Sequence, residues 1–186
     1  MKKHLAVTIV MLSCVLMVAL SSCNLITTDK DRFYVDEDNR LTMIDIEKTG
    51  SDIIVPEKVG NKVIHDIYLE SSHFSKIDSI DVSNVSELET FTLRLYGAGS
   101  HSKLKRIDFS KNKRVKSVHI FETKALEEST FNENCKSIGL YNTSVKKLDL
   151  KLLKKLKYFT YWDGPLENID LSNNTNLDQV WIKNAN

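Results

Sequence analysis

The feature of this sequence that most constrains its fold is a short apolar repeat. Its units read L-x-x-L-x-L, with other apolar residues also found at the L positions, as in LKRIDF, VKSVHI, VKKLDL, LENIDL and LDQVWI. Most units start 10 or 11 residues after the previous one, and two unit types alternate, so the full period is about 21 residues. The x-L-x-L part alternates apolar and polar residues, which is typical of a β-strand, and the rest of each unit is turn-like.

This period predicts a solenoid in which each unit forms one rung of a shared core. In residues 104–126, the spacing points Leu104, Ile107 and Phe109 into that core. No single unit can bury its own apolar face, so each rung stabilises the next. Because 41% of the 186 residues are hydrophobic, the composition is that of an ordinary globular domain.

The unit L-x-x-I-D-L-S-x-N followed by L-x-x-L-x-L resembles the short leucine-rich repeats of Bacteroidetes cell-envelope proteins, including BspA-like and internalin-like surface proteins. The resemblance covers residues 77–186 in five double units. It implies a mainly β leucine-rich repeat solenoid with short turns, displayed on the cell envelope. Two departures are Ser129, which replaces an aliphatic residue, and a five-residue insertion before Leu104.

Residues 32–76 are expected to form a small N-terminal β cap on the solenoid. The segment DIIVPEKVGNKVIHDI (52–67) resembles the one that precedes the repeats in BspA-like proteins. With RFYVDEDNRLTMIDI (32–46), it would supply short strands that turn at DEDN and at GN.

One stretch of the repeat region also fits a helix. Residues 145–159 would place Val145, Leu148, Leu152, Leu156 and Phe159 on one helical face, with lysines elsewhere, as in a basic membrane-surface helix. The same stretch keeps the L-x-x-L-x-L register of the units on both sides, and a helix would interrupt the stack. Agreement with its neighbours favours the repeat.

Residues 1–22 have the pattern of an export signal. A basic start, MKKH, precedes a 16-residue uncharged apolar run. The LSSC that ends it resembles the lipobox of bacterial lipoproteins, which implies that Cys23 is diacylated, palmitate included, and anchors the chain in the outer membrane. Two acyl chains suffice for stable anchoring. Residues 23–31 would then be the lipidated cysteine and a tether; an ordinary secretory signal with a chance cysteine is the alternative.

The mature chain would have neither a disulfide nor a basic charge excess. Cys14 leaves with the signal and Cys23 carries lipid, so Cys135 stands alone, at an apolar repeat position where a small buried hydrophobe fits. Loss of residues 1–22 removes Lys2 and Lys3 and no acid, so the formal charge falls from +1 to −1. That balance argues against nucleic acid as a partner.

The sequence contains no motif of a known catalytic or metal-binding type, and we expect neither a catalytic residue, a cofactor nor a metal. The G-x-G of YGAGS lies in the inserted segment, and the histidines lack ligand spacing. One acidic set recurs at the x of L-x-L, where stacking would align it: Asp81, Asp108, Asp149 and Asp170. Side-chain bonding to the local backbone explains these residues better than acid/base chemistry does.

Aromatic residues recur at outward positions of the second unit type and form the candidate binding site. We expect Phe121, Tyr141 and Tyr161 to form a column, with Tyr158, Trp162 and Trp181 beside it. Exposed aromatic patches often mark binding surfaces. The alternative is that these rings only stabilise the sheet by stacking.

The function predicted from these features is that of a lipid-anchored surface protein that binds another protein, with adhesion as one outcome, and that catalyses no reaction. The alternatives are glycan binding, an envelope enzyme that uses the acidic set, and a self-associating scaffold. Self-association would involve the C-terminal edge, where LDQVWIKNAN ends the sequence and Trp181 would lie beside an unpaired strand.

Overall fold

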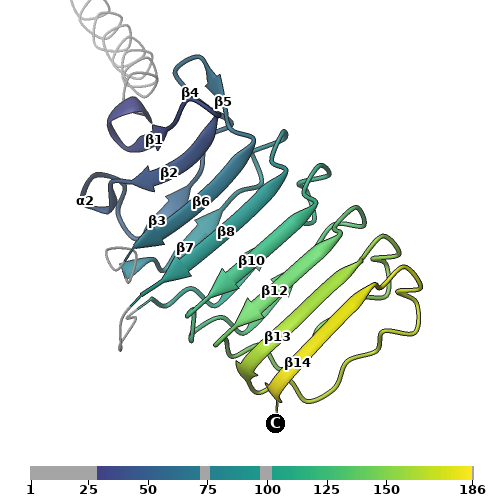
Figure 1. The fold of residues 1–186 in the computed structure, drawn as a ribbon. Helices are drawn as coiled ribbons and strands as arrows, with labels where there is room; N and C mark the ends of the chain where they lie inside the picture. The colour runs from purple at the N-terminus through teal and green to yellow at the C-terminus, as the bar shows by residue number, and fades with distance from the viewer. Residues whose placement is uncertain (1–28, 72–75, 97–101, 186) are drawn as a thin grey trace, which may run out of the picture.

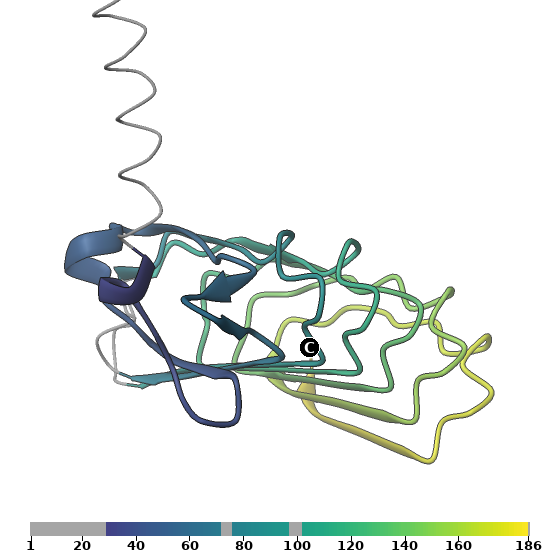
Figure 2. The ribbon, with the colours of Figure 1, turned by 90° about the horizontal axis from the view of Figure 1, so that it is seen from above.

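The structure is a computed structural model that describes residues 29–71, 76–96 and 102–185, and these residues wind into stacked coils (Figures 1 and 2). Each coil contributes one strand to a long sheet on one side of the molecule and a short segment to the opposite side. Apolar side chains fill the space between the two sides as one continuous core.

The long sheet, here called the main sheet, has eight strands. In spatial order they are β1 (Phe33–Val35), β2 (Arg40–Ile44), β6 (Asp66–Ser71), β8 (Thr90–Leu95), β10 (Ser117–Phe121), β12 (Ser137–Tyr141), β13 (Tyr158–Gly164) and β14 (Gln179–Ala185). Only β1 and β2 pair antiparallel, and all later pairs are parallel. Equivalent residues of successive coils therefore lie side by side, as Phe91, Val118 and Ile138 do in the core.

Shorter strands form the opposite side: β3 (Asp52–Ile54), β7 (Ser79–Asp81), β9 (Arg106–Asp108) and β11 (Glu128–Thr130). β3 pairs with β7 and β9 with β11, all parallel, and a single bridge between Lys147 and Asn168 continues the series. The aspartates of the acidic set are tied to the local turns, because each accepts the backbone N–H two residues on: Asp81 from Ser83, Asp108 from Ser110, Asp149 from Lys151 and Asp170 from Ser172. The prediction of local backbone bonding is confirmed.

The core confirms the in-out register predicted from the repeat. Leu104, Ile107 and Phe109 are all buried, as the three-then-two spacing indicated. Cys135 is also fully buried, and burial raises the pKa of its thiol from the ordinary 9.0 to about 12. A thiol with that pKa stays neutral, which agrees with the role of a small hydrophobe.

Buried asparagines join three of the coils to the preceding coil. Asn112 Nδ2 donates to the carbonyl oxygens of Val82 (2.8 Å) and Val85 (3.0 Å). Asn132 and Asn174 make bonds of the same kind with the preceding coil. Turns inside a solenoid leave backbone carbonyls away from water, and these side chains satisfy them.

Each of the last four strands of the main sheet has a residue with a left-handed backbone at or next to its end. The residues with φ between 51° and 56° are Glu122, Asn142, Asp163 and Asn184, at equivalent positions of four coils. Asn and Asp tolerate this conformation better than other residues with a Cβ, which explains their recurrence. The backbone thereby changes direction at the same point in these four coils.

At the N-terminal end, the predicted turns are present but the predicted cap boundary is not. The DEDN turn joins β1 to β2, and Gly60 and Asn61 join the two-residue strands β4 (Lys58–Val59) and β5 (Lys62–Val63). However, β6 pairs with β8, and β3 pairs with β7, across residue 76. The first solenoid coil therefore lies within residues 52–71. Only the segment before it, with η1 (Asp29–Asp31), the β1–β2 hairpin and α2 (Ile46–Thr49), covers the end of the stack.

The helical alternative for residues 145–159 is wrong. This stretch runs from a bridge residue through a turn into β13, with no helix. Leu153 is 2% exposed and Leu152 is 78% exposed, although the helix would have placed Leu152 on its apolar face. Packing against the neighbouring coils decides the conformation. The observed turns bury Val145, Leu153 and Leu156 between those coils, whereas a helix in this stretch could not bury all three in the same core.

The described residues form a mainly β leucine-rich repeat solenoid with short turns, as the repeat predicted. The predicted signal segment and Cys23 lie outside the described residues, as do the inserted residues 97–101, which include the G-x-G and His101. In the part of the chain that the structure describes, no helix is long and apolar enough to cross a membrane.

Candidate binding face

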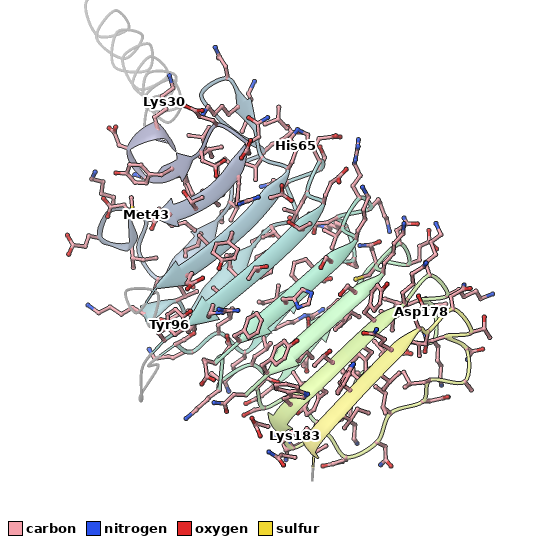
Figure 3. All side chains as sticks on the ribbon, in the orientation of Figure 1. Lys30, Met43, His65, Tyr96, Asp178 and Lys183 are labelled. Carbon is pink, nitrogen blue, oxygen red and sulfur yellow. The ribbon has the colours of Figure 1, made fainter. Side chains whose placement is uncertain are left out.

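The outer face of the main sheet, on the side away from the core, carries three rows of side chains. Parallel pairing in register places one outward residue of each strand in each row (Figure 3). Near the strand starts lies the first row, with Asp66, Thr90, Ser117, Ser137, Tyr158 and Gln179. The middle row contains Tyr68, Thr92, His119, Gly139, Thr160 and Trp181. Near the strand ends lies the third, here called the aromatic row, with Glu70, Arg94, Phe121, Tyr141, Trp162 and Lys183.

The aromatic row is a continuous ladder of ring contacts. Phe121 and Tyr141 stack with their centroids 4.3 Å apart and their planes 7° apart. Tyr141 meets Trp162 edge to face, with centroids 5.6 Å apart. A cation covers each end, since Arg94 Cζ lies 4.2 Å from the Phe121 centroid and Lys183 Nζ lies 5.7 Å from the Trp162 centroid. Cation–π contacts of this kind add to the stacking energy.

A hydrogen-bonded cluster continues the row beyond Arg94. The hydroxyl groups of Tyr68 and Tyr96 both donate to the Glu70 carboxylate, and together they hold its pKa below the ordinary value. Arg94 Nη1 donates to the Tyr96 hydroxyl at 3.3 Å. Figure 3 shows Tyr96 and Lys183 at the edge where the strands end, so the aromatic row runs along that edge. The cluster fixes the orientation of Arg94 over Phe121.

Stacking limits which surfaces of these rings a ligand can touch. One face of Phe121 is covered by Arg94 and the ring also stacks on Tyr141, so its faces are largely occupied. Tyr141 is likewise held between Phe121 and Trp162. The row therefore presents mainly ring edges to solvent, whereas Trp162, at 38% exposure, remains the most accessible ring in it.

His119 lies half-buried in the middle row and packs on Phe121. Its Nε2 is 3.2 Å from Ser137 Oγ, and burial, followed by the nearby Arg94 charge, lowers its pKa. A Cβ at Gly139 would come within 2.6 Å of His119 Nδ1 and 2.7 Å of Tyr141 Cε2, so glycine makes room for both rings. The His119–Ser137 pair resembles a base and a nucleophile, but within the described residues no carboxylate bonds the imidazole, as a catalytic triad requires.

The structure brings together three of the six predicted aromatic residues, and it contradicts the placement of Tyr161. Phe121, Tyr141 and Trp162 form the aromatic row. Tyr161 is fully buried, and its hydroxyl donates to the Val145 carbonyl at 2.7 Å. Strict alternation along β13 turns Phe159 and Tyr161 inward and Trp162 outward, so Trp162 takes the position predicted for Tyr161.

Tyr158 and Trp181 lie on the same face but in other rows. Tyr158 is in the first row beside Ser137, and Trp181 is in the middle row beside Thr160, so Lys183 rather than Trp181 ends the aromatic row. Trp181 is 59% exposed, and every side chain of β14 is exposed. The role predicted for this edge in self-association stays a prediction.

The prediction missed Tyr68, Glu70 and Tyr96, which complete the face at its N-terminal end. Tyr68 and Glu70 belong to IYLE in β6, an apolar-polar alternation that matches the repeat. Assigning residues 32–76 to a separate cap hid that match. Within residues 29–71, 76–96 and 102–185, no group of three or more His, Cys, Asp or Glu side chains is placed to hold a metal ion.

Comparison with known proteins gives one structural likeness. No protein-family model matches this chain. No curated protein matches it significantly in sequence. Among solved structures, the fold resembles the functional domain of InlJ from Listeria monocytogenes, a domain described as including a cysteine ladder. The two are 17% identical with a TM-score of 0.48, and the match covers 77% of this chain and 38% of the other. This chain thus spans well under half of the length of that domain.

Proposed function

We propose that this chain is a lipid-anchored envelope protein that binds a partner protein through the outer face of its main sheet and catalyses no reaction. The observation that carries the proposal is the aromatic row, an ordered line of partly exposed rings on a regular surface. Aromatic side chains contribute large contact areas at protein interfaces and are enriched there.

The stacking geometry supports a protein partner over a glycan. A sugar ring packs on a free aromatic face, and the faces of Phe121 and Tyr141 are largely covered by their neighbours. Ring edges, the Trp162 surface and the hydroxyl groups of the first row suit the mixed apolar and polar contacts of a protein interface.

The acidic set supports a structural role rather than the enzyme alternative. Each of its aspartates accepts a backbone N–H in its own turn, and Ser172 bonds lower the pKa of Asp170. A general acid needs the opposite shift, a raised pKa, to hold a proton near neutral pH. The turns therefore account for these carboxylates without catalysis.

The proposal is tested by affinity capture from envelope extracts with the full chain as bait. Trp162→Ala should reduce capture of a specific protein at least tenfold, because it removes the most accessible ring of the aromatic row. Leu152→Ala is the matched control, since it removes an exposed apolar side chain from a different surface and should leave capture unchanged. Equal capture by Trp162→Ala and the wild type, or capture of glycans alone, would contradict the proposal; circular dichroism checks that both variants are folded.

A further inference from the structure

A basic hollow lies at the edge of the main sheet where the strands begin. It has a volume of about 280 Å³. Its lining contains five cations, one amide and one carboxylate: Lys113, Arg114, Lys116, Lys136, Lys155, Asn134 and Glu89. The cations and the amide belong to the turns that lead into β10, β12 and β13. In Figure 3, His65 and Asp178 mark the two ends of this edge, on the opposite side of the outer face from Tyr96 and Lys183.

The repeat itself brings these cations together. Lys116 precedes β10 and Lys136 precedes β12, and the two strands pair in register from Ser117 and Ser137 onward. The backbone N–H of Lys136 donates to the Lys116 carbonyl at 2.7 Å, so the two lysines occupy adjacent rungs. Neighbouring strands lie about 4.8 Å apart, a distance at which like charges repel.

Only part of this positive charge is neutralised by the protein. Arg114 pairs with Glu87 at 2.6 Å and with Glu89 at 3.4 Å, and Lys116 pairs with Glu89 at 2.7 Å. Among the described residues, no carboxylate lies within 4.0 Å of the ammonium groups of Lys113, Lys136 or Lys155. Lys155 Nζ instead donates to the neutral Asn134 Oδ1 at 2.6 Å.

Carboxylates limit the basic hollow at both ends of the edge. Glu87, which pairs with Arg114, precedes β8 on one side, and Asp178, 4.0 Å from Lys157, precedes β14 on the other. A long polyanion that followed the solenoid axis would meet these acids and be repelled. A short acidic segment would meet an excess of cations, because the one lining carboxylate, Glu89, is already paired with Arg114 and Lys116. The formal charge of the whole chain, +1, provides no general attraction for polyanions.

We propose that the basic hollow receives a short acidic segment of the same partner protein that contacts the aromatic row. This inference rests on the proposed function for the identity of the partner as a protein. The hollow and the aromatic row border the same face. The five residue-to-residue steps from Lys116 to Phe121 span roughly 16 Å along β10. One domain-sized partner covers both, with apolar contacts at one edge and ion pairs at the other.

The test uses a synthetic hexaglutamate peptide and the detergent-solubilised full chain, with binding measured by calorimetry. Hexaglutamate should bind the wild type and weaken steadily as salt is raised. Lys136→Glu should weaken binding at least tenfold, because it places a carboxylate in the centre of the hollow. Lys58→Glu, the same charge change at the exposed residue of β4, is the matched control and should bind as the wild type does.

Three results would overturn the inference: no binding of hexaglutamate, equal binding by Lys136→Glu, or Lys136-dependent binding only of a sulfated polysaccharide or of anionic vesicles. Lys155→Glu provides a second variant in case Lys136→Glu does not fold. Trp162→Ala should bind hexaglutamate normally. Suppose that hexaglutamate binding depends on Lys136 and that Trp162→Ala still captures the envelope protein. That outcome would contradict the proposed function and leave the acidic-segment site standing.

Discussion

At the scale of single residues, side-chain amides hold neighbouring coils together. Asn174 is buried, and its Nδ2 donates to the carbonyl oxygens of Leu150 (2.8 Å) and Leu153 (2.9 Å) in the preceding coil. Asn176, two residues on, donates to the Lys154 carbonyl at 2.7 Å but is exposed. Both asparagines donate a side-chain hydrogen bond to a backbone carbonyl of the preceding coil. Water can replace the bond of the exposed Asn176 but not those of the buried Asn174.

Asn174→Ala should therefore destabilise the protein more than Asn176→Ala does. The first variant loses two buried hydrogen bonds and should lower the free energy of unfolding by about 1–3 kcal/mol. The second exchanges an exposed bond for water and should change it by less than about 0.5 kcal/mol. Urea denaturation of both variants measures the difference, and equal losses would show that the Asn174 bonds do not hold the coils together.

At the scale of elements, residues 150–157 show how packing against neighbouring coils determines whether a segment forms turns or a helix. Within this stretch, Leu150, Leu153 and Leu156 enter the core, and backbone bonds from Leu153 to Leu150 and from Leu156 to Leu153 shape two tight turns. Leu152 points into solvent. The lysines between them remain exposed, as they would also be on a helix, so charge alone does not distinguish the two conformations.

The pair Leu152 and Leu153 tests this conformation directly. Leu153→Ala leaves a cavity in the core and should lower the free energy of unfolding by about 2–5 kcal/mol. Leu152→Ala, its sequence neighbour, should change it by less than about 0.5 kcal/mol because the side chain is already in water. Thermal or urea unfolding gives both values; the opposite order would restore the helical interpretation.

At the scale of the whole molecule, the solenoid separates the two proposed binding regions. The outer face of the main sheet carries the aromatic row at one edge and the basic hollow at the other. The proposed anchor, Cys23, lies a few residues before the first described residue, Asp29. An anchored solenoid would thus keep the outer face free for a partner while its N-terminal end stays near the membrane.

Lipidation is tested on the full chain in a bacterial host by metabolic labelling with an alkyne fatty acid. The wild type should incorporate label, and Cys23→Ser should lose it, since the acyl chains require the Cys23 thiol. Cys14→Ser is the matched control, because the predicted signal removes that cysteine, and it should be labelled as the wild type is. Labelling of Cys23→Ser at the wild-type level would refute the lipoprotein assignment.

The sequence by itself determined the solenoid, the rung residues and the outward face. Those features depend on a local period: Leu104, Ile107 and Phe109 need only be apolar at a fixed spacing. The same pattern recurs in nearly every unit, so one irregular unit does not change the prediction. The candidate residues Phe121 and Tyr141 followed from the same alternation. Tyr161 was misplaced because it occupies the last apolar site of the unit LKYFTY, which points inward, and the outward position that follows Thr160 is Trp162.

Only the tertiary structure decided which outward residues touch each other and where the solenoid starts. The pairing of β3 with β7 and of β6 with β8 depends on contacts between residues about 25 positions apart, which no local pattern specifies. Arg94 over Phe121, Tyr68 and Tyr96 on Glu70, and the gathering of lysines around one hollow likewise arise from the stacking of coils. A period fixes which way a side chain points, but the register between strands fixes its neighbours, because neighbours come from other coils.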